Sequence, residues 1–578
     1  MNVETLPIED IRTDLVVVGA GGAACRAAVS ARAAGADVHL IAKAPMKTGG
    51  STVHGASEIM SMGAAAGFGD RRDQPEIHFQ DTMRAGRGFI DESLVRVLAE
   101  DAPKRIKDLI ALGVPFDQQE DGNYRLIRSD FGTYGRAMGA KGKTGLAFVE
   151  ALGKEMQRLG VVIDAPVMLL DIVRDRNGEL CGVLAYDSER HRLLHYRAPA
   201  VVIGAGGMHG MFGQQVSTRE MTGDGQAICF RHGAELINLE FHQFGPAMIH
   251  PYVQLFSKNI FVLHPKITNT EGEEFLPNYL PEGVTVDEVL DEKVFPFTIS
   301  NPSRYLDIAM AREINEGRGT PRGAVNFSFA HVPDEELRRT SPNTYRWMAE
   351  RGVSMREDMH EVGIAFQCMN GGVRMIGPDA ASTIPGVYVV GETAGGIRGP
   401  DRPGGNSLAE GQVFGHRAGE AAAARAAASK HAAEAATFDE SIDLIEASLN
   451  RQGGADLDAI ASAIRDDMQR HCLVEKSEEG LQKALGTVLA GRREIEAGFA
   501  ATPETLVEAL SIRNLAQCAE LVLRACLNRT ESRSAHYRVD HPGEDDRHWL
   551  RSVLVQRVGD GVALSDFHYE PQEQQKAG

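Results

Sequence analysis

Residues 240–251 read EFHQFGPAMIHP and place two histidines and a glutamine inside an apolar frame. Polar groups in such a frame are either hydrogen-bonded structural residues or functional ones, because an unpaired buried polar group costs free energy. Histidine is the side chain whose unperturbed pKa allows proton exchange near neutral pH. The stretch is therefore a candidate for acid–base chemistry, and the structural alternative stays open.

A glycine motif near the N-terminus has the residue types and spacing that bind a pyrophosphate. Leu15 to Val18 form an apolar run typical of a buried parallel strand, and Gly19, Gly21 and Ala24 follow in G-x-G-x-x-A spacing. A helical segment and a second β-like run, VHLIAKA, come next, which is the context that the motif requires. In that context the backbone can approach a pyrophosphate at the N-terminus of the helix.

The end of the second strand narrows the choice of dinucleotide. An acidic residue that would bind a ribose hydroxyl is missing, since Ala42 and Lys43 stand there. This disfavours NAD and leaves FAD open.

Three later stretches are rich in glycine at a strand end or a helix start: VVIGAGG at 201–207, GVYVVGETAGG at 386–396 and GGNSLAEGQVFG at 404–415. A helix beginning at Ser407 and Leu408 would point N–H groups at the electron-rich edge of a reduced flavin. Each stretch alone is also typical of a tight turn.

The bulk composition describes a globular protein and excludes several classes. The chain of 578 residues is longer than the ~250–300 residues at which single cores stop growing, so we expect several domains. Its net charge of −19 argues against a nucleic-acid surface. No apolar run approaches the ~18–20 residues of a membrane span, and the acidic N-terminus does not resemble a secretory signal. The seven scattered cysteines predict a cytoplasmic protein without disulfides and without a metal or iron–sulfur site of its own.

Motifs along nearly the whole chain resemble the flavoprotein subunit of the succinate dehydrogenase, fumarate reductase and L-aspartate oxidase family. They are GAGGAA at 19–24, TGGST at 48–52, TGDG at 222–225, SRYLDIAMAREINEGRG at 303–319, GETA at 391–394, RPGGNSL at 402–408 and NRTESRSAHYRVDHPGEDDRHWL at 528–550. The resemblance implies an FAD-dependent oxidoreductase of the α/β class. It also implies a Rossmann-like FAD-binding domain interrupted by an α+β capping domain and followed by a helical C-terminal domain.

The family's organisation, set on this sequence, gives five expected segments. They are an FAD-binding segment at 1–230, a capping domain at 231–352, a second FAD-binding segment at 353–425, a helical domain at 426–535 and a C-terminal tail at 536–578. The alanine-rich run at 421–436 has high helix propensity and is expected to start the helical domain. The polar tail is expected to wrap the surface.

The resemblance also implies how FAD is held. The expected contacts are Gly19, Gly21, Gly22, Ala23, Ala24, Lys43, Gly50, Ser51, Thr52, Ala205, Gly206, Asp224, Gly391, Glu392, Ser407 and Leu408. Some family members attach FAD covalently through a histidine just before the threonine of this segment. Here that position is Ser51, so the family pattern predicts non-covalent FAD. A covalent link shifted to His54, three residues further on, is the alternative.

The substrate half of the family pattern is largely rewritten. In the family, hydride passes between a substrate carbon and flavin N5 while arginines and histidines bind the carboxylates. Here Gly245 and Ala247 replace a substrate-binding His and Thr, and the arginine that transfers the proton has no counterpart. One family arginine survives as Arg402, which we expect to bind an anionic group of the substrate, with a salt bridge to a loop carboxylate as the alternative.

The remaining catalytic candidates come from the segment that opens the capping domain. They are His242, Gln243, His250, His264 and Lys266. Lys266 could supply the missing cation and His264 could carry the proton, because a pocket can set the pKa of an imidazole. A structural role stays open for each histidine.

These observations predict a flavoenzyme acting on a small carboxylate and exchanging electrons with an iron–sulfur or other redox partner. Three alternatives remain. They are an oxidase like L-aspartate oxidase, a flavoprotein like adenylylsulfate reductase with different chemistry, and a flavin-bearing subunit without catalysis.

Overall fold

A parallel sheet lies at the centre of the computed structural model, which describes residues 6–55, 57–429 and 439–569. Its strand order is β19-β11-β2-β3-β7, and every neighbouring pair is parallel. The strands are β2 (Leu15–Val18), β3 (Val38–Ile41), β7 (Val162–Asp164), β11 (Ala200–Ile203) and β19 (Val387–Val389). The three central strands are mostly apolar and buried, as parallel sheets require, and the half-buried His39 of β3 is the exception. The expected α/β fold is confirmed.

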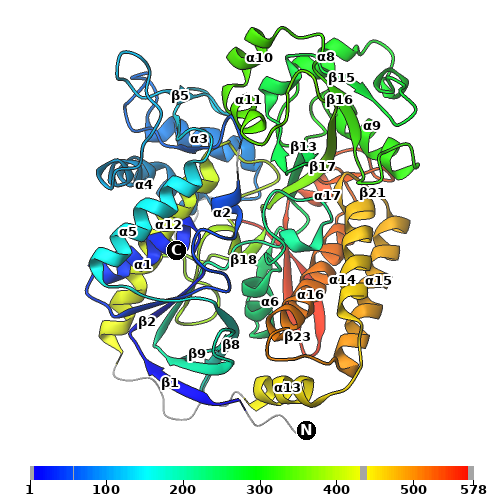
Figure 1. The fold of residues 1–578 in the computed structure, drawn as a ribbon. Coiled ribbons are helices and arrows are strands. Elements are labelled where there is room, and N and C mark those ends of the chain that lie inside the picture. The colour runs from blue at the N-terminus through cyan, green and yellow to red at the C-terminus, as the bar shows by residue number, and fades with distance from the viewer. Residues whose placement is uncertain (1–5, 56, 430–438, 570–578) are drawn as a thin grey trace.

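Two helices of small residues cover this sheet side by side (Figure 1). They are α1 (Gly22–Ala33) and α12 (Asn406–Ala428). A Cβ atom on Gly415 would lie 2.5 Å from the carbonyl oxygen of Ala23, and one on Gly419 would lie 2.4 Å from that of Ala27. Glycine at this spacing therefore lets the two backbones touch and fixes the start of α12 beside the start of α1. Because α12 begins at Asn406 and runs to Ala428, the first half of the alanine-rich run ends this helix, and its residues 430–436 lie outside the described part.

A second body, drawn in green at the top of Figure 1, stands over the carboxyl ends of the central strands. It is built on a sheet with the order β14-β13-β17-β16-β15. The strands are β13 (His242–His250), β14 (Gln254–Leu255), β15 (Lys266–Thr268), β16 (Val325–Ser328) and β17 (His360–Met369), and helices α8 (Val286–Asp291), α9 (Arg304–Asn315), α10 (Asp334–Thr340) and α11 (Pro342–Ala349) surround them. The sheet crosses the expected domain limit at 352, because β17 pairs with both β13 and β16.

The C-terminal part is helical at first and ends in a hairpin. Helices α14 (Leu457–Met468), α15 (Glu478–Ala497) and α16 (Leu506–Asn528) pack together on the right of Figure 1. The hairpin of β23 (Ser552–Val558) and β24 (Gly561–Phe567) then joins a sheet with the order β20-β18-β12-β23-β24. The expected surface-wrapping tail is therefore partly wrong, since the first four residues of β23 are buried. Their β-branched and apolar side chains favour a sheet position.

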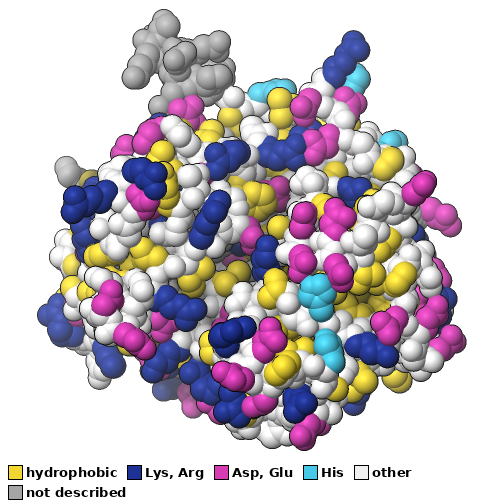
Figure 2. Space-filling model, turned by 90° about the horizontal axis from the view of Figure 1, so that it is seen from above, with side chains coloured by type: hydrophobic (Ala, Val, Ile, Leu, Met, Phe, Trp, Pro, Cys, Tyr) yellow, Lys and Arg dark blue, Asp and Glu magenta, His cyan; other side chains and the backbone are white. Residues whose placement is uncertain are grey.

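Basic and acidic side chains are interspersed over the face of the molecule seen in Figure 2. Among the described residues, no helix combines the length and the apolar character needed to cross a bilayer.

Candidate functional site

Two cavities meet where the central sheet, α12 and the green body come together. The first cavity is lined by the carboxyl ends of the central strands and by the start of α1, and the second by the start of α12 and the β13–β17 body. With their open mouths they hold about 970 and 1380 Å³ of empty space, which is the range of ligand-binding pockets or above it. Both are lined by Gly22, Ala23, Ser51, Thr52, Gly391 and Glu392. A ligand seated in the first can therefore reach the second.

The first cavity presents backbone N–H groups to its ligand. Helix α1 begins there behind Gly21, with no side-chain cap and no acidic residue in its first turn. The Gly22 N–H donates to Thr52 Oγ1 at 3.3 Å, and the other N–H groups of the first turn together with the helix dipole favour a phosphate. Gly19 has φ +106°, and a Cβ atom on it would lie 2.2 Å from the carbonyl oxygen of Gly204. Only glycine fits that turn. The backbone at Gly19 can therefore pack against the backbone of Gly204 and line the cavity.

The first cavity also contains an ion pair between Lys43, which stands where the fingerprint lacks its acidic residue, and Asp224. Lys43 Nζ lies 2.6 Å from Asp224 Oδ2, and its other contacts are the hydroxyls of Thr222 and Ser511 at 3.0 and 3.1 Å. Lys43 follows the end of β3 and Asp224 lies at the start of α6 (Asp224–Arg231). An acidic side chain from another segment therefore reaches the region where the fingerprint lacks its own.

The junction of the two cavities is a buried polar cluster. Glu392 Oε1 accepts the backbone N–H of Met369 at 2.9 Å, and Ser51 Oγ lies 3.4 Å from Glu392 Oε2 and 3.2 Å from His209 Nε2. His209 is fully buried and its Nε2 donates to the carbonyl oxygen of Gln367 at 2.7 Å. Sequence reasoning missed His209, although it lies two residues after the glycine-rich stretch at 201–207, which could have pointed to it.

The residues present fit FAD along both cavities. Every residue expected to contact FAD lines one of them except Ala24, which is fully buried in α1. A Cβ atom on Gly204 would lie 3.1 Å from Ala24 Cβ, so Ala24 serves the close packing of helix against strand. His54 is exposed, contacts the carbonyl oxygen of Thr48 at 2.8 Å and lines neither cavity. Ser51 does line both cavities.

The second cavity is lined by two basic side chains in very different states. Arg398 is buried and paired with a carboxylate: its Nε lies 3.0 Å from Glu410 Oε2, and its other nitrogens donate to Glu410 Oε1 and to the carbonyl oxygens of Met369, Gly391 and Ala394. Burial raises the pKa of Glu410, while the charge of Arg398 lowers it. This pair is neutral in sum and holds the loop before α12.

Arg402 has no carboxylate partner in the described part of the chain. Its Nη2 donates to Gln243 Oε1 at 2.9 Å, and its Nε is buried without a protein acceptor. The alternative of a salt bridge to a loop carboxylate is therefore not supported. A guanidinium that lines a cavity and keeps free donors is suited to bind a carboxylate.

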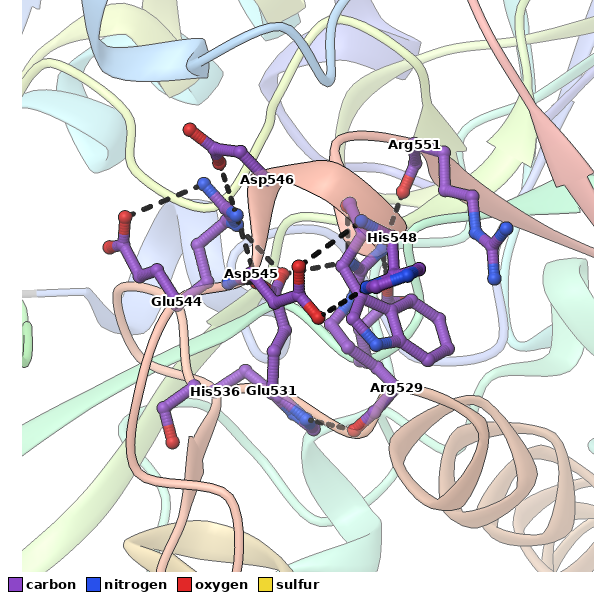
Figure 3. Close-up of polar contacts among 12 residues, drawn as sticks. Arg529, Glu531, His536, Glu544, Asp545, Asp546, His548 and Arg551 are labelled. Carbon is purple, nitrogen blue, oxygen red and sulfur yellow. Dashed lines mark hydrogen bonds and ion pairs between the residues drawn. The ribbon is translucent and has the colours of Figure 1, made fainter.

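Figure 3 shows a buried ionic cluster whose neighbour Ser534 contacts the loop that carries Arg402. Arg529 and Arg533 both bind Glu531, at 3.0 and 2.8 Å, and all three are almost completely buried. Ser534, next to this cluster, donates its hydroxyl to Asp401 Oδ2 at 2.6 Å. Burial raises the pKa of Asp401 to about 6. One hydrogen bond thus joins the stretch at 528–550 to the loop that carries Arg402.

The wall across from α12 is largely apolar, although Ser257 and Gln367 also line the second cavity. Ala247, Leu255, Phe295 and Ala365 form a separate buried cluster with Val216 against it, and Val216, Leu255 and Phe295 line the second cavity. A Cβ atom on Gly245 would lie 2.3 Å from the ring of Phe295. Gly245 and Ala247, which stand where the family has a His and a Thr, therefore make room for an aromatic ring.

A further acidic group, besides Glu392 and Glu410, lines the same space. Asp130 lines the second cavity, and burial raises its pKa while the charge of Lys258 lowers it. Cys368 also lines the cavity, and its thiol lies 3.3 Å from Gln243 Oε1. Neither residue was expected from the sequence, since both come from segments without a motif.

The candidates from β13 and the residues after it lie apart from one another. Gln243 is buried and lies behind Arg402, whereas His242 points to the opposite face of β13 and contacts the carbonyl oxygen of Cys472 at 2.9 Å. Burial lowers the pKa of His242 well below its usual value. His250 is exposed at the end of the strand and lines neither cavity.

The two residues expected to replace the missing arginine lie on the surface. His264 contacts Asp287 and Asp291 at 3.2 and 2.8 Å, and Lys266 contacts Glu274 at 3.2 Å. Neither lines a cavity. The prediction that His264 and Lys266 lie at the reacting centre is therefore wrong. The corresponding family segment lies beside the flavin, but this loop has a different sequence and follows a different path.

Comparison with known proteins gives matches over nearly the whole chain. A family model described as "FAD binding domain" matches residues 14–408, and one described as "Fumarate reductase flavoprotein C-term" matches residues 461–577. A fumarate reductase (CoM/CoB) subunit of Methanothermobacter marburgensis is 31% identical over 94% of this chain and 97% of its own length. The L-aspartate oxidase of Caulobacter vibrioides is 28% identical over 92% and 94%. The structure of Mycobacterium smegmatis Sdh1 in complex with UQ1 superposes with a TM-score of 0.84 and 27% identity over 97% and 95%.

Proposed function

The chain belongs to the fumarate reductase and succinate dehydrogenase flavoprotein family, which makes it an FAD-dependent oxidoreductase, and from that premise we propose that it transfers hydride between FAD and a small carboxylate. The observation that carries the proposal is Arg402, the basic side chain of the second cavity that has no carboxylate partner among the described residues. The cavity it lines joins the cofactor cavity at Ser51 and Glu392.

FAD, when bound, supplies a two-electron centre that accepts or returns hydride at N5. Arg402 binds the substrate carboxylate and stabilises negative charge that develops on the carbon next to it. Gln243 holds the guanidinium of Arg402 by accepting from Nη2, and Nη1 donates to the carbonyl oxygen of Pro403 at 3.4 Å. The start of α12 behind Gly405 directs free N–H groups into the same cavity. In the dehydrogenation direction, the substrate loses one hydride and one proton and gains a C=C bond.

The same proposal includes non-covalent FAD and a redox partner. Ser51 stands at the position of the covalent histidine, and His54 is exposed and lines neither cavity. The similarity to a fumarate reductase (CoM/CoB) subunit of Methanothermobacter marburgensis and to Sdh1 in complex with UQ1 supports electron exchange with another molecule. In the described part of the chain, no three His, Cys, Asp or Glu side chains gather as metal ligands.

The test uses the purified yellow protein under anaerobic conditions. A panel of saturated carboxylates is mixed with it, and bleaching of the flavin absorbance is followed in wild type, Arg402→Gln and Lys266→Gln. We expect bleaching that is at least ~30-fold slower in Arg402→Gln, because a charged hydrogen-bonded pair contributes a few kcal/mol. Lys266→Gln should match wild type, since Lys266 lies on the surface.

Equal bleaching in wild type and Arg402→Gln, or a purified protein without FAD, would overturn the proposal. Acid denaturation should release the flavin into the supernatant, and flavin that stays with the pellet contradicts the non-covalent part. Reoxidation by O₂ with stoichiometric H₂O₂ and no added acceptor would favour the L-aspartate oxidase alternative.

A further inference from the structure

One face of β13 backs both the apolar wall of the second cavity and the guanidinium of Arg402, although no residue of β13 itself lines the cavity. That face carries Gln243, Gly245 and Ala247, because side chains two residues apart in a strand point to the same side. Gln243 accepts from Arg402, a Cβ atom on Gly245 would strike the Phe295 ring, and Ala247 belongs to the Leu255–Phe295 cluster. At ~3.4 Å per residue, the apolar wall begins ~7 Å from the residue that holds the guanidinium.

The charges that line this cavity provide one free cation and no second one. Arg398 is paired with Glu410, and Arg402 is free of carboxylates among the residues that the structure describes. No lysine or histidine belongs to the described lining. Besides the two arginines, the ionisable groups in this lining are Asp130, Cys368, Glu392 and Glu410, and none of them can carry positive charge.

We propose that the substrate carries a single carboxylate, which binds Arg402, and that its other end is apolar and lies against Val216, Leu255 and Phe295. This inference rests on the proposed function, because it names the class of carboxylate that the same site takes. A second carboxylate would lose its hydration against an apolar wall without gaining a cation, which is unfavourable. A methyl or longer alkyl end would instead gain from burial.

Asp130 strengthens this preference. When charged, it repels a second carboxylate in the same cavity, and when protonated it offers one hydrogen bond in place of a cation. The charged state therefore favours a substrate with one negative charge, whereas the protonated state would accept a second carboxylate only through that one hydrogen bond.

The test compares acids with the same number of carbon atoms on the purified FAD-containing protein. Difference spectra of the flavin give dissociation constants for butanoate and crotonate against succinate and fumarate. We expect the monocarboxylates to bind at least ~10-fold tighter than the matching dicarboxylates, because the latter leave a buried charge unpaired. Arg402→Gln should weaken both classes.

Two variants convert the preference. Leu255→Arg places a second cation on the apolar wall and should shift the ratio of the two dissociation constants by ~10-fold or more toward succinate. Asp130→Asn removes the opposing charge and should shift the ratio in the same direction by ~3-fold or more, without adding a bulky group. Val253→Arg is the matched control, because Val253 is exposed and lies outside the cavity lining, and it should leave the ratio unchanged.

The outcomes separate the two levels of the proposal. If succinate or fumarate binds tighter than its partner in wild type while Arg402→Gln still weakens binding, the monocarboxylate inference is overturned and the proposed function stands. If no carboxylate perturbs the flavin, both fall. An unchanged ratio in both Leu255→Arg and Asp130→Asn, with FAD retained, also overturns the inference.

Discussion

The two cavities are built from different parts of the chain. The first uses backbone at the ends of neighbouring strands, where glycines admit a ligand and helix N–H groups face it. The second uses side chains such as Arg402, Phe295 and Asp130, which come from three segments distant in sequence. The difference teaches that this fold fixes the position of the cofactor by local turn geometry, whereas the choice of substrate depends on side chains that converge in space.

The first prediction breaks the backbone side of this comparison. Gly19→Ala should lower the free energy of unfolding by about 4 kcal/mol and abolish FAD binding, because strain at positive φ adds to a clash with the backbone of Gly204. The ratio of flavin to protein absorbance and chemical unfolding measure both effects.

Gly35→Ala is the matched control. Gly35 has φ +95°, yet nothing lies within 4 Å of a Cβ atom placed on it. We expect a cost of about 1 kcal/mol from strain alone, with FAD retained. Equal FAD content in the two variants would show that the turn at Gly19 does not control the cofactor cavity.

The second prediction compares the two arginines of the second cavity. Arg398 is expected to stabilise the fold, and Arg402 to bind the substrate. Glu410→Gln should lower the free energy of unfolding by about 3 kcal/mol, because it leaves the buried charge of Arg398 without its carboxylate. Arg402→Gln should change the free energy of unfolding by less than about 1 kcal/mol, because it breaks no ion pair. Thermal and urea unfolding of the two variants compare them. Similar losses in both would contradict the division of roles between the two arginines.

The third prediction concerns the anchor of the Arg402 loop. The pKa of Asp401 is about 6 in the folded protein against 3.8 for the unperturbed group. Between these values the folded state holds a proton that the unfolded state has released, so stability falls as pH rises through this window. The full effect is about 3 kcal/mol. Asp401→Asn removes this contribution. The free energy of unfolding of the variant, measured from pH 4 to 7, should therefore fall less steeply with pH than that of wild type. An identical slope in the variant would contradict the assignment.

The sequence predicted the lining of the cofactor cavity well and that of the substrate side poorly, for a physical reason. Gly19, Ser51 and Glu392 sit in short motifs whose spacing itself builds the turns. Nothing local marks Asp130 or Phe295 as cavity residues, since their place depends on how a loop and the capping segment pack over α12.

The same limit explains the candidates that moved. His264 and Lys266 have suitable chemistry, but the segment after β14 carries them to the surface, where acidic partners hold them. His242 was expected among the catalytic candidates, but it is buried beside Phe366, and this burial lowers the pKa of its imidazole well below the usual value. Arg402 was predicted because its motif leads directly into α12, which the cofactor side already fixes.

The central claim is that one unpaired guanidinium anchors the substrate beside an intact FAD site. The most direct measurement is the dissociation constant of crotonate, taken from flavin difference spectra of wild type and Arg402→Gln at equal FAD content. The account predicts a rise of at least ~30-fold in the variant, the value expected for losing a charged hydrogen-bonded contact. An unchanged dissociation constant would contradict it.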